Sequence, residues 1–137
     1  MEKRFARDVE ALGDIHTFIS EFAGQNELDS ATTYAINLAV EELFVNMVRY
    51  NKRGENAISI GLRREGDEIK ISLIDFDVDP FDITQFEEFD TAQSLSQRRA
   101  GGLGIHLTRS VMDSICYEYA DRQSKITLTR RVGAEHV

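Results

Sequence analysis

The chain has 137 residues, of which 42% are hydrophobic and 29% are charged, and its formal net charge is −8. A chain of this length fits one domain, over residues 1–137, and can bury roughly two-thirds of its unfolded surface. The negative charge argues against direct binding of nucleic acid, because neutralising phosphates takes clustered Lys and Arg. It does not exclude a small phosphorylated ligand, which backbone N–H groups can hold.

No apolar run approaches the roughly 20 residues that a membrane-spanning helix needs. The N-terminal residues Met-Glu-Lys-Arg-Phe lack the apolar region of a signal peptide. We therefore expect a cytoplasmic protein without a membrane partner. Cys116 is the one cysteine, which excludes a disulfide framework and a cysteine-based metal site. Its apolar neighbours predict a packing role.

An amphipathic helix is predicted over residues 7–22. Its apolar residues recur at three- and four-residue steps, as on one buried helical face: Val9, Leu12, Ile15, Ile19 and Phe22. Gly24 follows where a glycine commonly ends a helix. Phe5 is expected to close a short strand before this helix.

The second predicted helix begins near Asp29 or Ser30, both favourable N-caps, and runs to about Tyr50. Its apolar residues follow the same spacing: Tyr34, Ala35, Leu38, Ala39, Leu43, Phe44, Met47 and Val48. Glu42 and Asn46 stand four residues apart, so they lie one above the other at the edge of this stripe. The pair would point into a pocket beside the core, although helices often carry a polar residue at a stripe edge.

Alternating apolar and polar residues predict strands in the second half of the chain. Strands over 56–64 and 68–75, joined by the turn sequence Arg-Glu-Gly-Asp-Glu, form a hairpin. A third helix over 105–113 precedes two final strands over 114–120 and 124–131. The expected fold is an α/β (α+β) two-layer sandwich, in which about three helices cover one face of a mainly antiparallel, mixed sheet.

Residues 84–100 are polar and show little periodicity. A segment of this length without clear structure is more often a functional loop than a simple connector. We therefore expect a mobile lid over about residues 84–100.

Two further features lie at the ends of predicted elements. Gly101, Gly102 and Gly104 open the third helix, where free backbone N–H groups can approach a phosphate. A helix that simply begins with glycines explains this pattern about as often. The flanking residues match neither a P-loop nor a dinucleotide-binding fingerprint. Asp75 ends a strand, where its carboxylate can accept a hydrogen bond from an exocyclic amine, such as that of adenine, or from backbone N–H groups.

In combination these features resemble the GHKL, or histidine-kinase-like, ATPase superfamily. Within it the chain is similar to the bacterial anti-sigma-factor serine-protein kinases of partner-switching pathways. The resemblance is carried by residues 40–46 (Val-Glu-Glu-Leu-Phe-Val-Asn), by Asp75 with 80–82 (Pro-Phe-Asp), and by 101–113, which begin Gly-Gly-Leu-Gly-Ile-His-Leu. It spans about residues 8–131 and implies a Bergerat-type ATP-binding fold.

The resemblance implies, position by position, a site for ATP or ADP with Mg²⁺. Asn46 would ligate the Mg²⁺, Glu42 would be the general base for a protein serine or a water, and Asp75 would bind the adenine amino group. The remaining implied nucleotide-binding residues lie in or beside the glycine turn: Arg99, Gly101, Gly102, Leu103 and Gly104.

The resemblance also implies protein partners. They are a sigma factor, which the protein would sequester, and a STAS-type anti-anti-sigma protein, whose serine it would phosphorylate. A homodimer is expected on the same ground.

One position departs from the pattern of the resembled family, which usually shows Asp-x-Gly where this chain has Asp75-Phe76-Asp77. If that position needs a positive φ, Asp costs on the order of 1 kcal/mol relative to Gly, and weakened nucleotide binding is expected. Two functions stay open: an ATP-dependent serine kinase, and a binding module of the same fold that acts by sequestration alone. A sensor histidine kinase fragment is disfavoured, because His16 is followed by Thr-Phe-Ile and not by an acidic residue.

Overall fold

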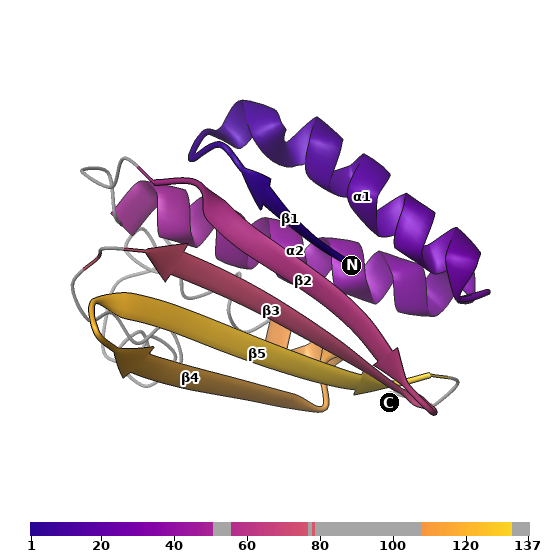
Figure 1. Cartoon of the computed structure of the whole chain (residues 1–137). Coiled ribbons are helices and arrows are strands. Elements are labelled where there is room, and N and C mark those ends of the chain that lie inside the picture. The colour runs from indigo at the N-terminus through magenta and orange to yellow at the C-terminus, as the bar shows by residue number, and fades with distance from the viewer. Residues whose placement is uncertain (51–55, 77, 79–107, 133–137) are drawn as a thin grey trace, which may run out of the picture.

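The computed structural model describes residues 1–50, 56–76, 78 and 108–132. Over these residues, five strands form one sheet in the order β1-β2-β3-β5-β4. The strands are β1 (Glu2–Phe5), β2 (Ile58–Glu65), β3 (Glu68–Phe76), β4 (Ser114–Ala120) and β5 (Gln123–Arg131). A short 3-10 helix, η1 (Val9–Ala11), leads into α1 (Leu12–Gln25), and α2 (Ser30–Tyr50) follows. Both α-helices lie on the same face of the sheet (Figure 1).

The predicted two-layer α+β fold is confirmed. Every described strand pairing is antiparallel, and the strands agree with the predicted ranges to within two residues. The short strand expected at Phe5 is β1, which pairs with β2 at the edge of the sheet. Residues 108–111, in the third predicted helix, are helical. The start of that helix and the predicted lid lie outside the described residues.

The hydrophobic core lies between the sheet and the helices. Along β3, Ile69, Ile71 and Leu73 are each 0% exposed and alternate with more accessible side chains. The helix α2 contributes a buried stripe: Ala35, Ile36, Ala39, Val40, Leu43, Phe44 and Met47. Tyr34 was predicted to belong to this stripe, and that prediction is wrong, since its side chain is 67% exposed. Tyr34 precedes Ala35 by one residue, a rotation of about 100° around the helix, which carries it out of the stripe.

The two helices are joined by a tight connection that differs from the prediction. Gly24 lies inside α1, and the residue with the left-handed backbone is Glu27, at φ 51°. The amide of Leu28 donates to the carbonyl of Ala23 at 3.0 Å, and that of Glu27 donates to Gly24 at 3.4 Å. These two bonds form a Schellman-type end and offset the cost of a non-glycine residue at positive φ.

The start of α2 agrees with the prediction. Asp29 accepts a hydrogen bond from the backbone amide of Thr32 at 2.6 Å, which satisfies one free N–H of the first turn. Hydrogen bonding from Thr32, through its side chain first and its backbone amide second, lowers the pKa of Asp29. The cap fixes where the helix begins and therefore which residues of α2 face the sheet.

The hairpin turns follow from backbone conformation. Gly66 has φ 60° between β2 and β3, while Asp121 and Arg122 have φ 53° and 59° between β4 and β5. Two successive residues at positive φ match the twist of a two-residue hairpin. The packing role predicted for Cys116 is wrong, because Cys116 is exposed on β4; its neighbours Ile115 and Tyr117 are the half-buried ones. Among the described helices, none combines the length and the hydropathy that a membrane span requires.

Candidate functional site

The helix pair, Glu42 and Asn46, stands on α2 as the sequence predicted. Asn46 is 3% exposed, whereas Glu42 is half-buried. Burial raises the pKa of Glu42, the neighbouring carboxylate of Glu41 raises it further, and Arg49 opposes both. A carboxylate with a raised pKa is a stronger base near neutral pH, so Glu42 has the electrostatic environment of a proton acceptor.

Asp75 is the second-last residue of β3, and its side chain lies on the face of the sheet that the helices cover. Its side chain is 0% exposed, and it stands opposite Ile58 on β2 and Ser124 on β5. The carboxylate oxygen Oδ1 is ion-paired with the guanidinium of Arg7, itself only 6% exposed. Asp75 is therefore buried with a cation against it, a context that the sequence did not predict.

Arg7 connects three parts of the chain at this point. Besides Asp75, its Nη1 donates to the backbone carbonyl of Met47 on α2 at 3.2 Å, and its Nε donates to the carbonyl of Asn56 at 3.3 Å. Met47 follows Asn46 directly, so Arg7 joins the end of β3 to the part of α2 that carries the helix pair. Burial lowers the pKa of Arg7, but a guanidinium stays charged at any physiological pH.

Arg7 is the site residue that sequence reasoning missed. Its partners Met47, Asn56 and Asp75 lie 40, 49 and 68 residues away, and no local spacing encodes such contacts. The sequence offered only one signal, a basic residue between a short strand and a helix.

Asp77, where the chain departs from the family pattern, lies outside the described part of the chain, and so do several predicted site residues: Arg99, Gly101, Gly102, Leu103 and Gly104. The described chain resumes at Thr108, in the third helix, and Thr108 is 0% exposed. The structure therefore brings Glu42, Asn46 and Asp75 to one region and leaves the glycine turn as a prediction.

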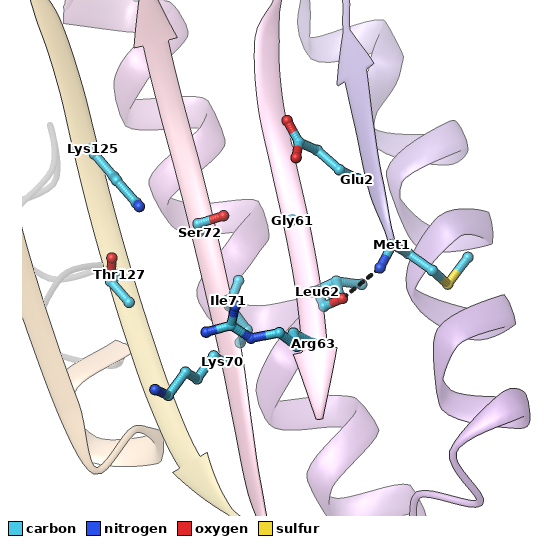
Figure 2. A pocket seen from close by; sticks show the side chains of 10 residues that line it. All are labelled: Met1, Glu2, Gly61, Leu62, Arg63, Lys70, Ile71, Ser72, Lys125 and Thr127. Carbon is cyan, nitrogen blue, oxygen red and sulfur yellow. Dashed lines mark hydrogen bonds between the residues drawn. The ribbon is translucent and has the colours of Figure 1, made fainter. Parts of the chain in front are cut away.

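A hollow of about 310 Å³ lies on the other face of the sheet, away from the helices (Figure 2). Its lining includes Arg63, Lys70 and Lys125, and Glu65 is ion-paired with the first two at 2.9 and 3.1 Å. Because Lys70 alternates with buried residues of β3, the hollow opens on the face opposite the core. It is therefore separate from the site that Glu42, Asn46 and Asp75 define.

Comparison with known families gives the class of the protein. The family model described as histidine kinase-like ATPase domain matches residues 5–130. The chain belongs to this family, and the resemblance seen in the sequence is confirmed at that level. A comparison with curated proteins found no significant match.

Solved structures share the fold at low sequence identity. The RsbU and RsbW domains of Rv1364c from Mycobacterium tuberculosis match with a TM-score of 0.70 and 14% identity, over 96% of this chain and 32% of that one. The SiaB–SiaC complex from Pseudomonas aeruginosa matches with a TM-score of 0.63 and 14% identity, over 94% and 86% of the two chains. The histidine kinase AdeS from Acinetobacter baumannii matches with a TM-score of 0.54 and 13% identity, over 98% and 68%.

These likenesses establish a common fold. The chain spans about a third of the Rv1364c chain that it matches.

Proposed function

We propose that the protein is an ATP-binding serine-protein kinase that sequesters a sigma factor and phosphorylates an anti-anti-sigma partner. The observation that carries the proposal is the helix pair, Glu42 and Asn46, placed beside the end of β3 in a chain of the histidine kinase-like ATPase family. The structural likeness to an RsbW domain and to SiaB in a complex with SiaC supports a role with protein partners.

The residues of α2 suit a nucleotide held with Mg²⁺. Asn46 presents a side-chain amide oxygen in a nearly buried position, and Mg²⁺ takes few protein oxygens because it retains several waters. When bound, the metal would neutralise charge on the phosphates. Glu42, one helical turn away, would accept the proton of the attacking hydroxyl, a role that its raised pKa favours.

The remaining roles rest on the predicted residues. Asp75 would accept a hydrogen bond from the adenine amine, and the turn at 101–104 with Arg99 would hold the phosphates. A homodimer in the cytoplasm is part of the proposal. Sedimentation at micromolar concentration is expected to show a dimer, and a monomer alone would remove that part.

A non-catalytic binding module of the same fold is the second candidate. The observation that favours it is the ion pair between Arg7 and Asp75, because this carboxylate is 0% exposed and already carries a cation against Oδ1, so the arrangement leaves no open approach for a base amine. Asp77, where the resembled family usually has Gly, points the same way.

A labelled-phosphate experiment tests the proposal. The purified chain is incubated with ATP labelled at the γ-phosphate, with Mg²⁺ and with protein from the native cytoplasm. If the protein is a kinase, the label is expected on a serine of a partner protein that the chain also captures. Capture of the same partners with and without ATP, and no label on any protein, would support the binding module and contradict the kinase.

A further inference from the structure

We infer that Arg7 is an internal competitor of the nucleotide base: its guanidinium occupies the Asp75 carboxylate, and a base amine binds there only after Arg7 withdraws. This inference rests on the proposed function, since it concerns the regulation of the same site.

The contacts of Arg7 are those of a residue held in place. Three donor groups of one guanidinium engage three separate acceptors, Asp75 Oδ1 and the carbonyls of Met47 and Asn56. The side chains of Arg7 and Asp75 are 6% and 0% exposed. A ligand cannot reach a carboxylate that is fully covered, so the described arrangement is closed toward a base.

Charge decides the competition between the two donors. A hydrogen bond from a guanidinium to a carboxylate is roughly twice as strong as one from a neutral donor, and the exocyclic amine of adenine is neutral. The amine alone therefore does not displace Arg7, and contacts elsewhere on the nucleotide must supply the difference. When the competent state is only partly populated, the apparent affinity falls by that fraction.

Withdrawal of Arg7 moves the segment between β1 and η1. Arg7 is followed by Asp8, whose backbone amide donates to the carbonyl of Ala6 at 2.7 Å and whose side chain caps η1 through Glu10. Nucleotide binding is thus coupled to the conformation of residues 6–8, next to an edge strand of the sheet. By reciprocity, a partner that binds this segment would change nucleotide affinity by the same factor.

The test compares Mg²⁺-ATP with Mg²⁺-ITP, whose base carries a keto oxygen in place of the exocyclic amine. Calorimetry is carried out on the wild type, on Arg7→Gln, and on the control Arg4→Gln. Arg4 lies three residues away, but its side chain is on the other face of the sheet. There its guanidinium carbon lies 4.8 Å from the centre of the Phe76 ring. Arg7→Gln is expected to bind ATP about tenfold more tightly than the wild type and to prefer ATP over ITP more strongly, whereas Arg4→Gln leaves both values unchanged.

Equal or weaker ATP binding by a folded Arg7→Gln, with the same ATP-to-ITP ratio as the wild type, would overturn the inference. Absence of any nucleotide binding by all three folded proteins would overturn the proposed function and the inference with it. If Arg7→Gln fails to fold, hydrogen exchange on the wild type decides. ATP is expected to speed exchange at the amides of Arg7 and Asp8, and unchanged or slower exchange there would contradict the displacement.

Discussion

On α2, Glu42 stands half-exposed at a helix edge and burial raises its pKa, whereas Asp75 on β3 is fully covered and paired with Arg7. The Glu42 carboxylate is partly accessible, although Asn46 in the same helix pair is only 3% exposed, whereas the ion pair of Arg7 and Asp75 is covered. Both lie on the same side of the sheet, joined through the carbonyl of Met47. The two parts of the candidate site can therefore be perturbed separately, Glu42 on α2 by removing its carboxylate and Asp75 on β3 by displacing Arg7.

The largest expected effect is on phosphoryl transfer. Glu42→Gln should slow transfer to the partner serine by about 10²–10⁴, the usual contribution of a general base, while nucleotide binding changes little. An assay with labelled ATP measures the rate of transfer to a partner protein that the wild type is known to phosphorylate. Glu41→Gln is the matched control, because Glu41 is the adjacent carboxylate and lies 3.5 Å from His16. Equal rates for wild type and Glu42→Gln would remove Glu42 from the mechanism.

The next effect is on the stability that the buried ion pair of Arg7 and Asp75 provides. Asp75→Asn leaves Arg7 buried without its carboxylate, and removing one partner of a buried pair costs about 3–5 kcal/mol of the free energy of unfolding. Denaturant unfolding measures it. The control is Glu65→Gln, which breaks the exposed pairs with Arg63 and Lys70 and should leave stability close to that of the wild type. Similar stability of the two variants would show that the ion pair does not hold this end of the sheet.

A smaller effect is expected at the metal ligand. Asn46→Ala should weaken Mg²⁺-dependent nucleotide binding by at least the roughly 10–100-fold that follows loss of a group supporting a metal. Titration with ATP, with and without Mg²⁺, measures the difference. Asn37→Ala on the same helix is the control, since its side chain donates to the carbonyl of Thr33 at 3.1 Å. If both alanine variants keep full Mg²⁺ dependence, Asn46 is structural.

The smallest effect is a pH dependence of stability. Because the pKa of Glu42 is raised above its ordinary value of 4.5, the folded state binds this proton more tightly than the unfolded state. The contribution of Glu42 therefore makes the wild type less stable as pH rises from about 4.5 through the raised pKa. Glu42→Gln should match the wild type below that window and become the more stable protein above it. A difference in the free energy of unfolding between the two proteins that stays constant at all pH values would contradict the burial of Glu42.

Local patterns predicted most of the fold. The alternation of apolar and polar residues predicted β2 and β3, and the capping residue Asp29 predicted the start of α2. The four-residue spacing of Glu42 and Asn46 predicted the helix pair. The errors arose where the signal was not local: Glu27 ends α1 through bonds that no residue type demands, and Tyr34 lies just beyond a stripe whose limits depend on the sheet. Arg7 could not be predicted, because its carboxylate partner is 68 residues away. The glycine turn at 101–104 stays a prediction.

Calorimetry of the wild-type protein with ATP, in the presence and absence of Mg²⁺, tests the central claim most directly. Saturable binding that requires Mg²⁺ is expected, because Asn46 acts through the metal while Arg7 opposes the base. Absence of heat at about millimolar nucleotide, where a dissociation constant near 1 mM would still be detected, would contradict nucleotide binding, provided that circular dichroism shows the protein to be folded.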